Sequence, residues 1–255
     1  MPASAASRPA LSDEQLAELL ELIGDADSVE LKLTVPESEH FAVAASLGID
    51  PLEAEIRQVW FFDTPELGLD GHGVVVRARR IQGKAGDIIV KLRPVVPRDL
   101  PKKLRRSPNF NVEVDAMPGG FVCSGRLRER VDNARVREVA TGARPLDDLL
   151  SDTHRKLIAE HTSGAFTPDD LSALGPILVL KARFEPEGLG RRLVAELWMY
   201  PDNSRVLELS TKCEPRDAFL AAAETRVFLS NRGVELGGEQ QAKTRKALEF
   251  FAGRA

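Results

Sequence analysis

Lysines and arginines that recur at every second position are the residues of this sequence with the most evident chemistry. Arg77 is followed two places later by Arg79, and Lys91 by Arg93. Because residues i and i+2 of a β-strand lie on the same face, each pair is expected to project to one side of a strand, with apolar residues on the other. Guanidinium groups bind phosphate oxygens with forked donors, and ammonium groups bind them as point charges. Strands of this kind could together bind a polyanion.

The polar faces of all the expected strands carry more cations than anions. The cations are Lys32, Arg77, Arg79, Lys91, Arg93, Lys181, Arg183 and Lys212, and the anions are Glu30, Glu113, Glu196 and Glu208. Two interpretations are open. A sheet with one solvated face would alternate in the same way, with its bases serving solubility. A closed barrel would instead turn the cations toward one another, where charges ~5 Å apart repel by about 3 kcal/mol at an effective dielectric near 20, and a polyanion would relieve that repulsion. Carboxylates among them could hold a divalent cation that bridges the same anion.

The elements that must position these residues follow from periodicity and from turn and cap signals. Helices are expected from Ser12 to Gly24, at about 215–232 and at about 239–252. Residues 1–10 are expected to form a disordered tail, 11–255 a single domain, and about 118–172 a helical insertion, because that segment is polar and lacks a clear period of two. Strands are expected at about 28–35, 55–62, 73–82, 87–96, 110–116, 176–186, 190–200 and 204–212.

Composition excludes several classes of protein. The 255 residues are 43% hydrophobic and 29% charged, as in an ordinary globular chain, and no apolar run reaches the ~18 residues of a membrane span. Two distant cysteines, Cys123 and Cys213, indicate neither a disulfide framework nor a metal knuckle, so we expect a cytoplasmic protein. A net charge of −4 does not favour nucleic acid as a partner and leaves a small phosphorylated molecule or polyphosphate.

The same residues carry a resemblance to a known family, the CYTH family or triphosphate tunnel metalloenzymes, which includes class IV adenylate cyclases and thiamine triphosphatases. Ser28-Val29-Glu30-Leu31-Lys32 resembles its Glu-x-Glu-x-Lys motif, and the resemblance extends to about Phe251. The further matches, in the family's order, are Phe61-Phe62-Asp63-Thr64-Pro65, Arg77-Ala78-Arg79, Lys91, Lys181 with Arg183, Glu208-Leu209-Ser210, and Lys243 within Gln241-Ala242-Lys243-Thr244-Arg245.

The resemblance implies an α+β fold in which an eight-stranded antiparallel β-barrel has helices packed outside and binds linear triphosphates with Mg²⁺ or Mn²⁺. It implies that Glu30, Lys32 and Glu208 are catalytic and that Glu30 and Glu208 hold the metal. Glu113 and Glu196 are further metal candidates from the strand faces. The implied phosphate ligands are Lys32, Arg77, Arg79, Lys91, Lys181, Arg183 and Lys243, and Arg93 and Lys212 join them because they share the same strand faces.

The sequence departs from the family's pattern at three positions. Ser28 and Ser210 stand where each Glu-x-Glu motif has a carboxylate, and a neutral hydroxyl is a poor ligand for a hard divalent cation. Trp198 stands where the family has an acidic residue, either as a buried structural residue or as a stacking platform for a nucleobase. Three functions therefore stay open: hydrolysis of tripolyphosphate or a nucleoside triphosphate, cyclisation of ATP by a class IV-type adenylate cyclase, and non-catalytic binding of polyphosphate or nucleotide.

Overall fold

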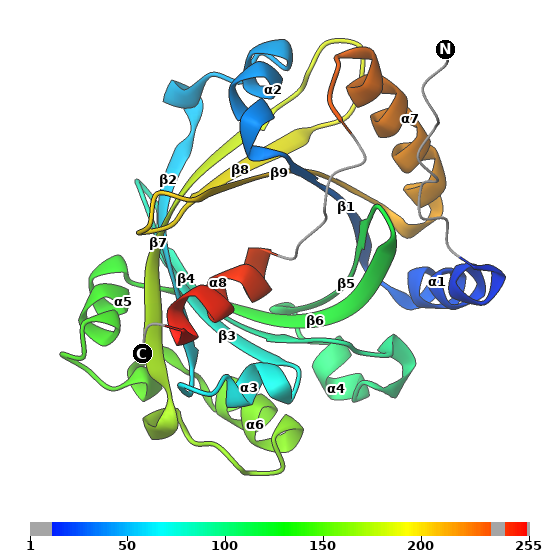
Figure 1. Cartoon of the computed structure of the whole chain (residues 1–255). Helices are drawn as coiled ribbons and strands as arrows, with labels where there is room; N and C mark the ends of the chain where they lie inside the picture. The colour runs from blue at the N-terminus through cyan, green and yellow to red at the C-terminus, as the bar shows by residue number, and fades with distance from the viewer. Residues whose placement is uncertain (1–11, 236–242, 254–255) are drawn as a thin grey trace.

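The computed structural model describes residues 12–235 and 243–253. Over these residues, nine strands close into a barrel in the order β1-β5-β6-β4-β3-β2-β7-β8-β9 (Figure 1). Neighbouring strands are antiparallel, except that β1 and β5 run parallel. The expected barrel is confirmed, with nine strands rather than eight and one parallel pair. The strands are β1 Ser28–Val35, β2 Glu55–Asp63, β3 Val74–Ile81, β4 Gly86–Leu92, β5 Phe110–Met117, β6 Gly120–Val131, β7 Ser172–Phe184, β8 Leu193–Met199 and β9 Arg205–Cys213.

Helices cover much of the outside of the barrel (Figure 1). The first begins as its sequence predicts, because the Ser12 hydroxyl accepts from the backbone of Gln15 at 3.2 Å and the Gln15 side chain accepts from the Ser12 backbone at 3.0 Å. In the described ranges, no helix is long and apolar enough to cross a membrane. The expected tail at 1–10 and the expected helix start at 239–242 lie outside the described residues. The helices are α1 Asp13–Asp25, α2 His40–Ser46, α3 Gly68–Gly71, α4 Lys102–Arg105, α5 Asn133–Ala140, α6 Asp152–His161, α7 Ala218–Asn231 and α8 Lys243–Ala252.

The strand β6 corrects the sequence interpretation, which placed helices from about residue 118. Gly120–Val131 is a barrel strand between β4 and β5, and helices follow only from Asn133. The alternation is hidden because an acid interrupts the outward, apolar face of this strand. That acid is Glu129, whose carboxylate accepts a hydrogen bond of 2.7 Å from the Ser151 hydroxyl at the start of α6. An outer helix thus supplies a polar partner where a strand normally presents an apolar residue.

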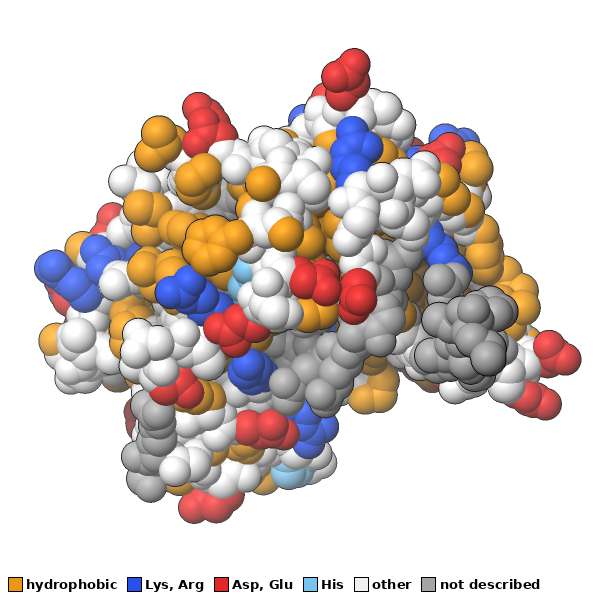
Figure 2. All heavy atoms as spheres, turned by 45° about the horizontal axis from the view of Figure 1, so that its top comes forward, with side chains coloured by type: hydrophobic (Ala, Val, Ile, Leu, Met, Phe, Trp, Pro, Cys, Tyr) orange, Lys and Arg blue, Asp and Glu red, His pale blue; other side chains and the backbone are white. Residues whose placement is uncertain are grey.

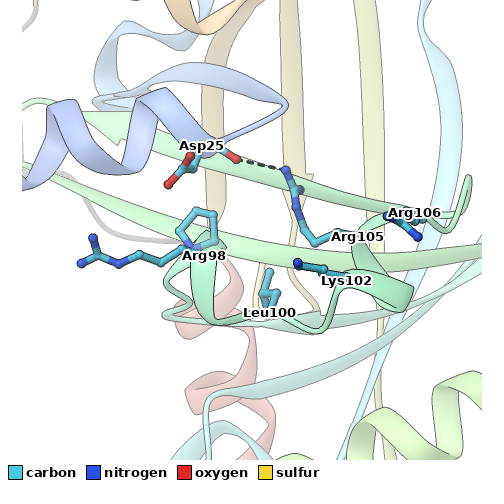
Figure 3. A pocket seen from close by; sticks show the side chains of 7 residues that line it. Asp25, Arg98, Leu100, Lys102, Arg105 and Arg106 are labelled. Carbon is cyan, nitrogen blue, oxygen red and sulfur yellow. Dashed lines mark hydrogen bonds between the residues drawn. The ribbon is translucent and has the colours of Figure 1, made fainter.

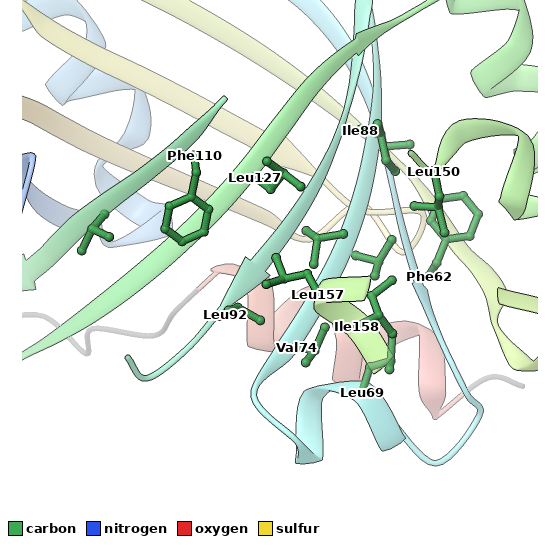
Figure 4. Packing of buried hydrophobic residues seen from close by; sticks show 14 of the residues in the cluster. Phe62, Leu69, Val74, Ile88, Leu92, Phe110, Leu127, Leu150, Leu157 and Ile158 are labelled. Atoms are coloured by element: carbon green, nitrogen blue, oxygen red, sulfur yellow. The ribbon is translucent and has the colours of Figure 1, made fainter. Parts of the chain in front are cut away.

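The hydrophobic core lies mainly between the barrel and its outer helices. In Figure 4, Leu157 and Ile158 of α6 pack against Val74 of β3 and Leu92 of β4, and all four belong to one buried cluster. A second cluster lies beneath α7 and α2 and includes Phe228. Each fully buried side chain of this size contributes roughly 1.5–3 kcal/mol relative to an exposed one. The apolar residues of the strands thus point outward, which leaves the opposite faces for the barrel interior.

Helix α8 closes the barrel interior on one side of the charged residues. Its Ala247 and Leu248 are buried in a cluster with Val59, Phe61 and Trp198, which belong to the strands β2 and β8. Val59 and Trp198 also line the interior cavity together with charged residues of the same strands. This apolar plug places the first residue of α8, Lys243, inside the barrel.

Candidate active site in the barrel lumen

The interior of the barrel, which we call the lumen, is a cavity lined by side chains from all nine strands and from α8. Nine of the lining side chains are cations and five are carboxylates, a formal excess of four positive charges in a chain whose net charge is −4. On the face shown in Figure 2, acidic, basic and hydrophobic side chains are interspersed. The charged lining residues are Glu30, Lys32, Arg57, Arg77, Arg79, Lys91, Arg93, Glu113, Asp115, Arg126, Lys181, Glu196, Glu208 and Lys243.

The structure brings most of the sequence-predicted site residues to this lumen, but two of the thirteen lie outside its lining. The Arg183 side chain is 40% exposed and lies 3.9 Å from the carboxylate of Glu55. The Lys212 side chain is 44% exposed and pairs with the carboxylate of Glu113. Both share a strand face with lumen residues but lie further along their strands, and strand alternation alone does not report this difference.

Three lumen residues escaped the sequence interpretation. Asp115 lies two places after Glu113 on β5, so the same alternation would have identified it. Arg57 shares the inward face of β2 with Val59, two places later, so the same alternation would have identified it as well. Arg126 belongs to β6, the strand that the sequence did not reveal.

Asp115 is the acidic centre of one corner of the lumen. Its carboxylate is fully buried and lies 2.8 Å from the ammonium of Lys32, 2.9 Å from that of Lys91 and 3.0 Å from the guanidinium of Arg93. Burial alone would raise the pKa of Asp115, but these three cations outweigh it and hold the pKa well below its usual range. The same corner contains Glu30, which lies directly opposite Asp115 in the parallel pairing of β1 with β5. The corner is thus a preorganised array of alternating charges.

Two carboxylates form a second wall, on β8 and β9. Glu196 and Glu208 are directly opposite in the antiparallel ladder. The ammonium of Lys243 donates to both of them, at 2.7 Å to Oε1 of Glu208, and Lys181 donates to Oε1 of Glu196 at 2.6 Å. Burial works against the charge of Lys243, but the two carboxylates overcome it and raise its pKa. We call Glu196, Glu208, Lys181 and Lys243 the β8–β9 wall.

Trp198 is a buried structural residue rather than an open stacking platform. Its side chain is 2% exposed, and its ring centroid lies 6.3 Å from that of Phe61. The ammonium of Lys243 lies 5.2 Å from the centroid of the indole ring, on its lumen side. A nucleobase therefore has no accessible face of Trp198 to stack on.

The arginines of β3 differ in their partners. Arg79 binds the buried carboxylate of Asp87 through two hydrogen bonds of 2.7 and 2.6 Å. Arg77 has no acidic partner in the described part of the chain, and its buried Nε has no hydrogen-bond acceptor. Burial, reinforced by the positive charge of Arg79, lowers the pKa of Arg77 to about 9. Arg126 on β6 likewise lacks a hydrogen-bonded or ion-paired acid among the described residues. These two guanidiniums are available to an external anion.

Three carboxylates at the Asp115 corner could hold a divalent cation. Glu30, Glu113 and Asp115 each offer an oxygen, and these atoms lie within 4.8 Å of one another. Hard cations such as Mg²⁺ and Mn²⁺ prefer oxygen ligands, so the donor set fits. The Ser28 hydroxyl adds a neutral neighbour, 3.5 Å from the carboxylate of Glu113. Glu208, which the family pattern made a metal ligand, is not a member of this group.

A second depression lies outside the barrel, between the end of α1 and α4 (Figure 3). Its basic residues belong to the run Lys102–Arg106 and its neighbour Arg98. Arg105 is already bound there, at 2.8 Å to the carboxylate of Asp27 and 3.0 Å to the carbonyl oxygen of Asp25. The depression is open to solvent, where ion pairs contribute little. The enclosed lumen is therefore the stronger candidate site.

Comparison with known proteins finds similar folds but no similar sequence among family models and curated proteins. No family model and no curated protein matches this chain. A solved structure of a provisionally assigned adenylyl cyclase from Hippeastrum, described as having a dominant triphosphatase activity, is similar at a TM-score of 0.59, with 18% identity over 83% of this chain and 91% of that one. A provisionally assigned adenylate cyclase from Bacillus halodurans is similar at a TM-score of 0.59, with 12% identity over 86% of this chain and 97% of that one. At these identities the likeness establishes a shared barrel fold.

Proposed function

We propose that this protein is a CYTH-like tunnel enzyme that binds and hydrolyses a linear triphosphate inside its lumen. The observation that carries the proposal is the excess of nine cations over five carboxylates around one enclosed axis. Buried like charges repel strongly at low effective dielectric, and a polyanion is the ligand that offsets this repulsion. Arg77 supports the same conclusion, because its buried Nε has no acceptor, which is unfavourable until an anion binds.

Catalysis in such a site would depend on positioning and charge stabilisation. Arg77, Arg79 and Arg126 would bind phosphate oxygens with forked donors. Lys32, held between Glu30 and Asp115, would move from carboxylate to phosphate oxygens as the substrate enters. A divalent cation at Glu30, Glu113 and Asp115 would supply Lewis-acid polarisation of the phosphoryl group. Glu30 would also orient the attacking water.

The lumen favours inorganic tripolyphosphate over a nucleotide. Nucleobases commonly stack on aromatic side chains, and Trp198 is the one aromatic residue among the described lining residues. Because Trp198 is 2% exposed, no aromatic platform is available for adenine. The cyclase alternative also requires adenosine to be positioned for attack by its ribose hydroxyl, and the lining offers mainly cationic donors for this purpose. Hydrolysis of inorganic tripolyphosphate requires no group that binds a base or a ribose, so it fits these lining residues best.

The decisive experiment is a ³¹P NMR survey of tripolyphosphate and ATP, each with Mg²⁺ or Mn²⁺. We expect phosphate and pyrophosphate from tripolyphosphate, with slower turnover of ATP. Cyclic AMP would identify a cyclase instead. The absence of turnover together with a thermal shift on adding tripolyphosphate would identify a non-catalytic binding module. The absence of any thermal shift at low salt would reject the phosphate clamp, since ligand at a hundredfold excess over Kd stabilises by ~2.7 kcal/mol.

Two variants separate binding from catalysis. Glu30→Gln should abolish turnover while tripolyphosphate still raises the melting temperature, because the substitution removes one carboxylate and leaves every lumen cation in place. Glu160→Gln is a matched control, because Glu160 lies on the exposed surface of α6 with its side chain 53% exposed. Equal residual activity in the two variants would remove Glu30 from the reaction.

A further inference from the structure

Lys243 holds an unusual position because one ammonium bridges two adjacent carboxylates. Glu196 and Glu208 lie directly opposite each other on β8 and β9, where like charges would otherwise repel. Lys243 donates to Oε2 of Glu196 and to Oε1 of Glu208, and Lys181 occupies the other oxygen of Glu196. The β8–β9 wall therefore contains two acids and two lysines and has no formal net charge.

The packing of α8 fixes Lys243 in this position. Its side chain is 12% exposed, and its backbone carbonyl lies 3.4 Å from the Tyr200 hydroxyl, which donates to it. One turn further along, Ala247 and Leu248 anchor the helix in the apolar plug. At the Asp115 corner, the side chain of Lys32 is confined to a similar degree at 13% exposed, and those of Lys91 and Arg93 are less confined at 23% exposed. Lys91 can therefore turn from Asp115 to a phosphate more readily than Lys243 can leave the wall.

We propose that Lys243 serves as the resident cation of the β8–β9 wall and excludes a divalent metal from Glu196 and Glu208. The proposal rests on the proposed function, because it concerns where the metal of that reaction binds. Mg²⁺ and Mn²⁺ require several oxygen ligands, and Ser210, the residue two places after Glu208, offers only a neutral hydroxyl. Displacing Lys243 would also leave a buried ammonium without a partner, which is costly.

As a consequence, two neighbouring parts of the lumen have different roles. The metal binds at the Asp115 corner through Glu30, Glu113 and Asp115, and Lys243 supplies the positive charge at the adjacent wall, since β9 pairs with β1. Glu208 then acts as a positioning residue that holds Lys243 toward the substrate rather than as a metal ligand. Tripolyphosphate would contact the β8–β9 wall through an ammonium that is present with or without added metal.

Titration of the substrate-free protein with Mn²⁺, followed by electron paramagnetic resonance of the free ion, tests this assignment. Glu30→Gln should weaken Mn²⁺ binding at least tenfold, whereas Glu208→Gln should change it less than twofold. An equal loss in the two variants would show that Glu208 is a metal ligand and would overturn the proposal. Neither of these two variants changes α8, so their comparison remains informative even if variants of Lys243 do not fold.

Variants of Lys243 provide the complementary test. Lys243→Met should raise Mn²⁺ affinity several-fold, and the gain should disappear in the double variant Lys243→Met/Glu208→Gln. Lys243→Arg, which keeps the charge, should retain the native affinity. No gain in a folded Lys243→Met protein would overturn the proposal, even if the native protein binds no Mn²⁺. These titrations contain no triphosphate, so their failure would leave the proposed hydrolysis untouched, and a lack of turnover would not alter their outcome.

Discussion

Arg77 and Arg79 are neighbours on the inward face of β3, but replacing them should shift stability in opposite directions. Arg79 binds both carboxylate oxygens of the buried Asp87, at 2.7 and 2.6 Å. Arg77 has no acidic partner within residues 12–235 and 243–253, and its Nε is buried without an acceptor. Burial first, and the neighbouring positive Arg79 second, lower the pKa of Arg77 to about 9. The charge of Arg77 therefore lowers the free energy of unfolding of the ligand-free protein.

The size of the effect follows from this environment. Each pKa unit corresponds to about 1.4 kcal/mol, so keeping Arg77 charged costs several kcal/mol before structural relaxation and water penetration are allowed for. Methionine keeps the apolar stem, and Arg77→Met should raise the free energy of unfolding by about 1–3 kcal/mol. Arg79→Met should lower it by about 3–5 kcal/mol, because Asp87 would keep only the half-exposed Arg128 as a partner.

Urea denaturation at neutral pH and low salt measures both changes, and thermal melting should follow at roughly 2–4 °C per kcal/mol for a chain of this size. Tripolyphosphate titration completes the test. Both variants should lose roughly 10- to 100-fold in affinity, because a hydrogen bond to a charged group contributes about 1.5–3 kcal/mol. If Arg77→Met destabilised the protein as much as Arg79→Met, Arg77 would have an internal partner, and the argument that it awaits an external anion would be wrong.

Two further predictions concern the lysines and the acidic centre of the lumen. Burial lowers the pKa of Lys91 and Lys181 from 10.5 to about 8, so the unfolded chain binds more protons than the folded one between these values, and the free energy of unfolding should rise with pH over that window. Tripolyphosphate affinity should fall over the same window as the two lysines lose charge; calorimetry at about pH 7.5 and 9.5 measures this, and Lys91→Met/Lys181→Met should lose most of the dependence. Asp115→Asn should destabilise the protein by about 3–5 kcal/mol in urea, because it removes the acid that three cations share. A change below about 1 kcal/mol would contradict the assignment of Asp115 as their common counter-ion.

Strand alternation predicted much of the barrel because a period of two reports directly which side chains share a face. Arg77, Arg79 and Lys91 were assigned to the lumen on this basis, and all three line it. The alternation failed for β6 because Glu129 interrupts the outward face, and its partner Ser151 belongs to a helix that is distant in sequence. The alternation of polar and apolar residues therefore identifies the outward face of a strand only where the outer helix presents apolar side chains to it.

The pairing of charges across strands could not be predicted, because it depends on register rather than on spacing within a motif. In the ladder of β1 with β9, Glu30 faces Lys212, whereas Glu208 faces Thr34 four positions further along β1. The family pattern joined Glu30 and Glu208 at one metal, but their registers separate them along the barrel. Each carboxylate instead acquires a different lysine, Lys32 for Glu30 and Lys243 for Glu208.

The parallel pairing of β1 with β5 explains why carboxylates still gather in one part of the lumen although Ser28 and Ser210 are serines. This pairing places Glu30 beside Asp115 and Ser28 beside Glu113. The acids of β5 therefore gather around Glu30 at the corner where the first motif lacks one of its own, and the three carboxylates lie within reach of a single ion. At the β8–β9 wall, the neighbouring strand β1 places Glu30 four positions from the residue that faces Glu208, and a lysine from α8 supplies the positive charge. The metal position that we propose therefore lies beside β5, where these three carboxylates gather.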